Sequence, residues 1–166
     1  VGHVIVSIIG TFISRWVLLT GFYGRDFLGF LTEETLEIKQ TAMISLMENK
    51  SASRRIQGVN YIEEFNEPDD AIVEALAERM LYDENVNVRA TAVEVLGKFT
   101  TSDKVKNTFI HALKIEKDPG IQIAIIQVLG EMEEKKAVAP MQQLLADEET
   151  PAFVKEQIES VLPNII

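Results

Sequence analysis

Hydrophobic residues recur at a regular interval through the last four-fifths of the chain. With Val88–Gly97 as the reference, similar segments begin 33 residues later at Ile121, after another 33 at Val154, and 34 residues earlier at Arg54. Within each segment the apolar positions are three or four residues apart, which places them on one face of a helix. We therefore predict four equivalent amphipathic helices.

Equivalent positions keep their chemistry from one segment to the next, in four columns that form the predicted core side of these helices. The columns are Gly58, Ala92, Ile125 and Ile158; Tyr61, Val95, Val128 and Val161; Ile62, Leu96, Leu129 and Leu162; and Phe65, Phe99, Met132 and Ile165. Four copies with one spacing indicate an internal repeat.

A second amphipathic pattern precedes each of these segments. The expected first helices are Glu34–Glu48, Asp70–Leu81, Asp103–Ile115 and Lys136–Ala146. Turn residues separate the helices, and Ser102, Pro68 and Pro151 are of types that favour helix starts. Because no single helix can bury its own apolar face, stacked pairs are required. We predict an all-α solenoid of about four helical hairpins, over residues 34–66, 67–100, 101–133 and 134–166.

Residues 85–97, NVNVRATAVEVLG, resemble the second helix of a HEAT repeat, in which a polar turn precedes a Val-Arg pair, small residues and a Leu-Gly end. Arg55, Arg89 and Lys155 fill the basic position of that family, and Gln122 departs from it. The resemblance implies a right-handed solenoid whose second helices line a concave, protein-binding face. The expected partner contacts are Gln57, Asn60, Glu64, Thr91, Glu94, Lys98, Gln127, Glu131 and Gln157.

The first 31 residues have a different, continuously apolar character. Val4–Tyr23 is twenty residues long and contains one charged residue, Arg15, so its length suits a transmembrane helix. A central Arg opposes insertion by about 2.5–3.5 kcal/mol, which the surrounding Ile, Val, Leu and Phe residues offset at about 0.3–0.6 kcal/mol each. We predict a membrane span within residues 1–31 and a repeat domain over 32–166. The alternative is a soluble helix packed on the end of the array.

The chain as a whole resembles bacterial single-span membrane proteins with a small HEAT-repeat domain. The matching segments are residues 21–25, 51–60, 83–97 and 134–151. The resemblance implies an inner-membrane location with the repeat domain in the periplasm. A cytoplasmic domain remains the alternative, because Arg25 next to Asp26 is a weak topology signal. Since the chain begins at Val1, preceding residues are expected, and in some such proteins they form an anti-sigma-like zinc finger.

The net charge of the chain limits the classes of partner that it can bind. The formal net charge is −10, and residues 32–166 carry 14 basic against 25 acidic side chains. An acidic surface repels phosphate backbones, so we expect no nucleic-acid partner. The chain contains no cysteine, which excludes disulfides, thiolate nucleophiles and cysteine-ligated zinc within it.

No pattern predicts a catalytic residue, a metal ligand set or a cofactor. The two histidines are His3 and His111, and no acidic residue stands at helical spacing from His111. Adjacent carboxylates lie in loops or at helix ends, where water and the helix dipole stabilise them. We predict a membrane-tethered scaffold, not an enzyme, that binds a protein partner in envelope signalling or regulation. The alternatives are a soluble HEAT-repeat adaptor and, less favoured, a HEAT-like lyase.

Overall fold

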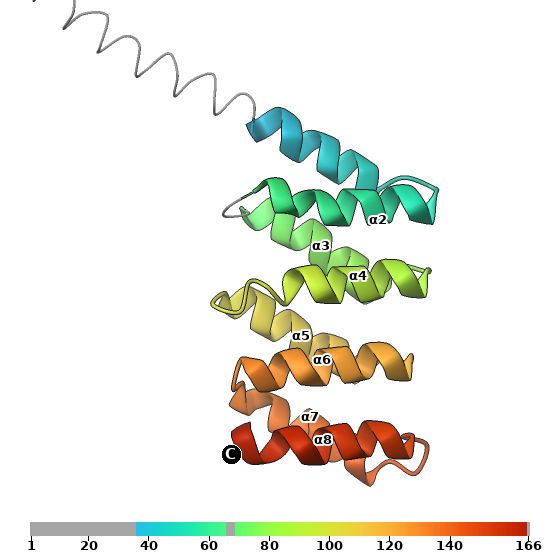
Figure 1. The fold of residues 1–166 in the computed structure, drawn as a ribbon, viewed down its shortest axis with the longest axis vertical. Coiled ribbons are helices and arrows are strands. Elements are labelled where there is room, and N and C mark those ends of the chain that lie inside the picture. Colours follow the sequence, from blue (N-terminus) through green and yellow to red (C-terminus); the bar gives the residue numbers. More distant parts are fainter. Residues whose placement is uncertain (1–35, 66–68, 166) are drawn as a thin grey trace, which may run out of the picture. The chain divides into compact units, whose positions relative to one another are not determined.

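The computed structural model describes residues 36–65 and 69–165, apart from the side chains of Glu63 and Glu64 (Figure 1). The chain divides into two compact units, residues 1–41 and residues 42–166. We call the described part of the second unit the array. Regular secondary structure within the described ranges is entirely helical, and no helix there is long and apolar enough to cross a bilayer. The predicted span Val4–Tyr23 lies outside these ranges.

Helices follow one another in pairs along the array. Residues 36–47 are helical and lead into it. The elements after them are α2 (Ala52–Asn60), η1 (Tyr61–Glu64), α3 (Asp70–Tyr82), α4 (Val86–Leu96), α5 (Asp103–Ile115), α6 (Pro119–Glu131), η2 (Lys135–Ala137), α7 (Val138–Ala146) and α8 (Ala152–Ile165). The predicted succession of first and second helices is confirmed over the described residues.

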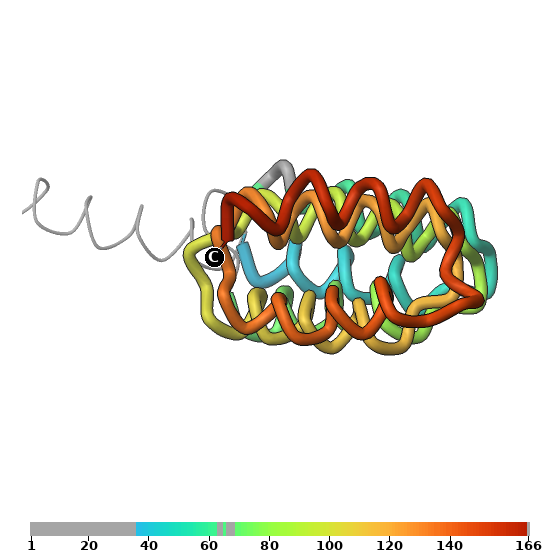
Figure 2. The backbone as a smooth tube through the Cα atoms, turned by 90° about the horizontal axis from the view of Figure 1, so that it is seen from below, coloured from blue at the N-terminus to red at the C-terminus, as the bar shows by residue number. Residues whose placement is uncertain are grey.

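The helices form two layers, which Figure 2 shows end-on. The second helices α2, α4, α6 and α8 lie in one layer, and the first helices α3, α5 and α7 lie in the other. Within each layer consecutive helices are in contact, and each first helix also packs on the second helix of its own pair. Each helix therefore contacts its own pair and the adjacent pairs, as expected of a helical solenoid.

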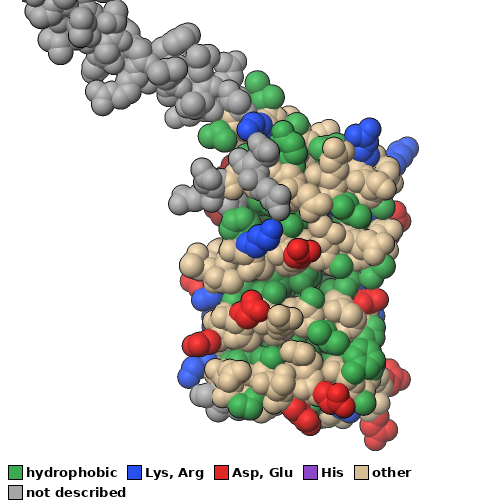
Figure 3. Space-filling view, in the orientation of Figure 1, with side chains coloured by type: hydrophobic (Ala, Val, Ile, Leu, Met, Phe, Trp, Pro, Cys, Tyr) green, Lys and Arg blue, Asp and Glu red, His purple; other side chains and the backbone are tan. Residues whose placement is uncertain are grey.

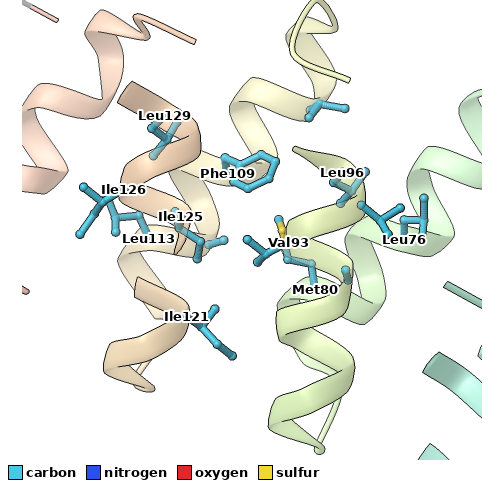
Figure 4. Close-up of a cluster of buried hydrophobic side chains, with 14 of the residues drawn as sticks. Leu76, Met80, Val93, Leu96, Phe109, Leu113, Ile121, Ile125, Ile126 and Leu129 are labelled. Carbon is cyan, nitrogen blue, oxygen red and sulfur yellow. The ribbon is translucent and has the colours of Figure 1, made fainter. Parts of the chain in front are cut away.

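The core runs continuously between the two layers. From the second helices it takes the predicted columns, so that Ala92, Leu96, Ile125 and Leu129 are fully buried. First helices supply the opposing side chains, among them Phe109, and Figure 4 draws part of this cluster. Burial of each large aliphatic or aromatic side chain contributes about 1.5–3 kcal/mol.

One position of the repeat has a different chemistry in the last helix pair than in the pairs before it. Val59, Val93 and Ile126 occupy equivalent positions on α2, α4 and α6, and the next pair buries each of them almost completely. On α8 the equivalent residue is Glu159, which is exposed. The fourth pair is therefore polar at a position where the first three pairs are apolar.

Side-chain caps define most of the helix starts. The Asp69 carboxylate accepts a hydrogen bond from Ile72 N–H at 2.9 Å at the start of α3, and the Ser102 hydroxyl accepts one from Val105 N–H at 3.4 Å at the start of α5. Such caps are each worth about 0.5–2 kcal/mol. The expectation for Ser102 is confirmed. Pro151 directly precedes α8, whereas Pro68 lies outside the described residues.

The helix expected to start at Lys136 starts two residues later, and a proline explains the difference. We expected a helix from Lys136, but the α-helical part starts at Val138, after a 3₁₀ turn. Pro140 has no N–H, so it is tolerated in the first turn of a helix, where N–H groups have no partner within the helix. A second proline, Pro163, lies inside α8, which continues to Ile165. Pro163 is exposed, so water can solvate the carbonyl it leaves unpaired.

Gly58 allows a close approach between consecutive helices. A Cβ atom at this position would lie 2.7 Å from the backbone nitrogen of Met47. We expect Gly58→Ala to lower the free energy of unfolding by about 1–3 kcal/mol through overpacking. Helix propensity alone would raise it by about 1 kcal/mol, so the sign is diagnostic. Gly120→Ala, at an exposed position in the first turn of α6, is the control: its Cβ would meet only the Asp118 carboxylate, at 3.1 Å, and no backbone atom, so we expect a change of less than about 1 kcal/mol. Urea unfolding followed by circular dichroism measures both.

Candidate protein-binding surface

The second-helix layer carries the residues that the repeat pattern assigned to a partner. We call its outward side the second-helix face. Gln57 and Asn60 on α2, Glu94 and Lys98 at α4, and Gln127 and Glu131 on α6 are exposed, whereas Thr91 on α4 and Gln157 on α8 are half-buried. The structure therefore places these residues on one side of four stacked helices. Glu64 lies in η1, and its side chain is not among those described.

The second-helix face is polar without a dominant charge. Figure 3 shows this side of the array, where backbone and uncharged polar groups alternate with partly buried hydrophobic side chains, and acidic and basic side chains are scattered. Amide side chains on α2, α6 and α8 both donate and accept hydrogen bonds. Gln127 Nε2 already donates to Glu131 Oε1 at 3.2 Å within α6. The surface is therefore suited to hydrogen bonds with a peptide and lacks the chemistry of a phosphate site.

A buried ion pair links the first and second pairs of helices. Arg55 on α2 donates two hydrogen bonds to the carboxylate of Asp83, at 2.6 Å from Nε and 2.8 Å from Nη2. The exposed fractions of the two side chains are 6% and 1%. Arg55 Nη1 also donates to the carbonyls of Asn49 and Lys50, in the turn between the two helices of its own pair. The guanidinium therefore holds two consecutive turns together.

The same arrangement recurs one pair further along. Arg89 on α4 donates to both carboxylate oxygens of Glu116, at 2.8 and 3.0 Å, and its Nη1 donates to the carbonyl of Asp83 at 2.9 Å. Glu116 Oε1 in turn accepts from the backbone N–H groups of Lys117 and Asp118. We call this series of side chains from α2, α4 and α6 to the neighbouring turns the ladder.

Gln122, the equivalent residue on α6, forms the bond to a backbone carbonyl but not the ion pair. Its Nε2 donates to the carbonyl of Glu116 at 2.9 Å, equivalent to the bond from Arg89 to the Asp83 carbonyl six residues before it. A neutral amide cannot form the second, ionic bond to the following turn. The departure of Gln122 from the basic pattern thus preserves the backbone contact and omits the ion pair.

The repeat pattern predicted the basic residues of the ladder but not their acidic partners. We assigned Arg55 and Arg89 to the basic position of the repeat, but their acidic partners were not recognised. Asp83 and Glu116 are 33 residues apart, and each stands six residues before a basic or amide side chain of the following helix. This spacing was the available signal. Because the ladder fixes each pair against the next, it also sets the relative positions of residues across the second-helix face.

Hydrogen bonds and neighbouring charges together outweigh the effect of burial on the pKa of Asp83 and Glu116. Burial alone would raise the pKa of Asp83, but hydrogen bonds from Arg55 and from Asn85 N–H, with the charges of Arg55 and Arg79, hold it below its ordinary value. Glu116 follows the same rule: burial opposes ionisation, and the bonds from Arg89, Asp118 and Lys117 lower its pKa. Both groups are therefore held as carboxylates in the folded protein.

Acid should weaken the ladder. A carboxylate with a lowered folded-state pKa contributes stability that is complete above its unfolded pKa, about 3.9 for Asp and 4.3 for Glu. That contribution is lost as the pH falls through the folded-state value. We expect the stability difference between the wild type and Asp83→Asn/Glu116→Gln to be constant near neutral pH and to narrow below about pH 4. Urea unfolding across this range measures it. An unchanged difference at acid pH would contradict the ladder's role.

Other sites that the sequence analysis considered are not assembled among the described residues. No group of three or more His, Asp or Glu side chains there could hold a metal ion, and every buried side-chain nitrogen or oxygen there has a hydrogen-bond partner. His111 is exposed on α5, and His3 lies outside the described ranges. Two of the paired carboxylates, Asp69 and Asp70, form the start of α3.

Comparison with known proteins identifies the repeats. The sequence model of a family described as HEAT repeats matches residues 73–162, more than half of the chain, from α3 into α8. No curated protein sequence matches the chain.

Proposed function

Because this chain belongs to the HEAT-repeat family, whose repeats generally mediate protein–protein interaction, we propose that its second-helix face binds a segment of a partner protein. The observation that supports this is the alignment of exposed polar side chains across α2, α4, α6 and α8. A buried core and the ladder keep these helices in fixed relative positions, so little ordering of the face is required when a partner binds. The proposed action is binding, without a reaction step.

The composition of the face favours a segment that offers its own hydrogen-bonding groups. Gln57, Asn60, Gln127 and Gln157 each carry an amide that can pair with peptide N–H and C=O groups. Glu94 and Glu131 add negative charge, and Lys98 adds one positive charge between them. We propose an extended or helical peptide segment held mainly by polar contacts along the stack.

Site-specific photo-crosslinking tests the position of the partner. A photo-reactive amino acid replaces Glu94 or Gln127 on the second-helix face, and Asn107 or Gln142 on exposed positions of α5 and α7 serve as controls. We expect adducts of one defined mass from the first two positions only, in cells that express the full chain. Adducts from the control positions alone would move the binding surface to the first-helix layer.

We further propose that Val4–Tyr23 tethers the protein to the bacterial inner membrane, with the repeat domain in the periplasm. Support comes from the sequence: twenty residues contain a single charge, and Trp16, Phe22 and Tyr23 lie toward one end as interfacial anchors do. Such a tether would place the second-helix face near envelope proteins, in keeping with a role in envelope signalling or regulation.

Alkaline carbonate extraction of membranes tests the tether. Retention of the full chain in the pellet, together with its digestion by protease in spheroplasts, is expected. Release into the supernatant would show that Arg15 prevents insertion and would favour the soluble adaptor. Retention with protection from protease would place the repeat domain in the cytoplasm.

A further inference from the structure

Exposed large hydrophobic side chains of the array gather in one place. Among the described residues of 42–166 they are Tyr82 (65% exposed), Val86 (39%), Ile115 (37%) and Phe153 (53%). Tyr82 ends α3 and Val86 begins α4, Ile115 ends α5, and Phe153 is in the first turn of α8. All four therefore stand at turns from a first helix to a second helix. Single exposed apolar residues are normal on a protein surface, but their restriction to equivalent turns of three consecutive pairs is not random scatter.

We call this side of the array, made of residues 82–87, 115–120 and 147–153, the turn edge. It lies at the right in Figure 1, and in the same orientation Figure 3 shows hydrophobic and acidic side chains together along it. It adjoins the second-helix face but consists of different residues. Its apolar side chains have no counterpart on that face, where the exposed positions are polar.

The turn edge is acidic. Asp83 and Glu116 are neutralised by Arg55 and Arg89 in the ladder. The carboxylates that remain in the three turns are opposed by one lysine, Lys117; they are Glu84, Asp118, Asp147, Glu148 and Glu149. Of these, Glu84 lies 3.6 Å from Arg55, which is already paired with Asp83. The adjoining helical turns add Glu78, Arg79, Lys114, Lys155 and Glu156, so the excess of negative charge persists.

A hollow beside Tyr82 adds a concave feature to the first of these turns. It has a volume of about 400 Å³ and is lined by Tyr82, by the carboxylates of Glu48, Asp83 and Glu84, by the basic side chains of Lys50, Arg55 and Arg79, and by Asn49. Charges of the two signs are therefore balanced in the hollow, and they add no preference for a cation. The exposed Tyr82 ring beside it can contact an apolar or a cationic side chain of a partner.

From these observations we propose that the turn edge docks a basic amphipathic segment of another protein, distinct from whatever occupies the second-helix face. Stacked helices are about 8–10 Å apart, so apolar anchors on consecutive turns are separated by about 10 Å. Two turns of a helix advance about 10.5 Å, which matches an apolar residue at every seventh position. Basic residues beside these anchors complement the exposed carboxylates and speed association. The segment therefore lies along the stack with one anchor at each turn.

A designed peptide provides the probe. It is a fluorescein-labelled helix of about 20 residues, about 30 Å long, with Leu at every seventh position and Lys beside each Leu. Two matched peptides carry Ser in place of Leu, or Glu in place of Lys. Fluorescence anisotropy with the full chain in a zwitterionic detergent should give an affinity at least about tenfold higher for the Leu/Lys peptide than for either control. Binding should weaken as salt is added.

Substitutions in the protein test whether the designed peptide binds at the turn edge. Tyr82→Ser/Phe153→Ser is expected to reduce the affinity about tenfold or more, since exposed aromatic anchors dominate such contacts. Glu148→Lys/Glu149→Lys should reduce it as well. Glu94→Lys/Glu131→Lys makes the same change in net charge on the second-helix face and is the matched control, expected to retain binding. Circular dichroism confirms that each variant is folded, and all six substituted positions are exposed.

Two outcomes would overturn the proposal. If both charge-reversal pairs weaken the peptide equally and Tyr82→Ser/Phe153→Ser has no effect, binding is a general attraction of a basic peptide to an acidic protein. If sedimentation shows self-association of the chain that Phe153→Ser abolishes, the turn edge contacts a second copy instead. Either result leaves the crosslinking test of the second-helix face unaffected, because that test uses Glu94 and Gln127.

Discussion

Replacing Asp83 with Ala is expected to lower the free energy of unfolding by about 3–5 kcal/mol, one of the two largest effects in this chain. The carboxylate is 1% exposed and accepts both hydrogen bonds that Arg55 donates across the boundary between the first two helix pairs. Its removal leaves a guanidinium charge buried without its partner, and Arg79 also loses a contact at 3.4 Å. Urea unfolding of the purified variant measures the loss.

Two further variants distinguish the cost of leaving a buried charge unpaired from the general effect of a mutation on stability. Arg55→Met/Asp83→Leu removes both charges and should recover much of the stability, because the unpaired charge is then absent. Glu74→Ala removes one partner of an exposed pair, Lys104 to Glu74 at 3.5 Å, and should change stability by less than about 1 kcal/mol. If Asp83→Ala were no worse than Glu74→Ala, the ladder would be an incidental contact.

Replacing Phe109 with Ala should cost a similar amount, about 3–5 kcal/mol, by a different mechanism. Phe109 is on α5, is fully buried and belongs to the cluster drawn in Figure 4. The neighbouring helices cannot close the resulting cavity without leaving their contacts with the flanking pairs. In a solenoid each pair is stabilised by its neighbours, so weakening the third pair should also loosen the fourth.

Hydrogen exchange reveals where this loss occurs. Amides of α5 to α8 should exchange faster in Phe109→Ala, while those of α2 keep more of their protection. Phe153→Ala removes a ring of the same size from an exposed position and should change stability by no more than about 0.5 kcal/mol. Uniformly faster exchange along the whole array would show instead that the array unfolds as one cooperative unit.

Stability of the array and geometry of the second-helix face are linked through the ladder. Arg55 and Arg89 each join a second helix to the turn of the following pair. Damage to the ladder should therefore reduce partner binding on the second-helix face before the helices themselves unfold. Gln122 lacks the ionic bond, and its single bond to the Glu116 carbonyl lies within the third pair, so the boundary between the third and fourth pairs depends on apolar packing.

The helix boundaries show what can and cannot be predicted from the local sequence. Asp103–Ile115 was predicted to the residue, because Ser102 caps its start. The start placed at Lys136 was two residues early, because the sequence pattern alone did not show that Pro140 stands in the first turn of α7, where a proline is tolerated.

The repeat, the two helices of each pair and the side of each second helix that faces the core were determined by the sequence itself. Periodicity carries this information because a helix must bury its apolar face, and four copies of one spacing require stacked equivalents. Only the tertiary structure decided which charges meet. Asp83 and Glu116 lie 28 and 27 residues from Arg55 and Arg89. The gathering of Tyr82, Ile115 and Phe153 on one edge likewise depends on how consecutive pairs stack. Such contacts join residues that no local pattern connects, and stacking alone brings them together.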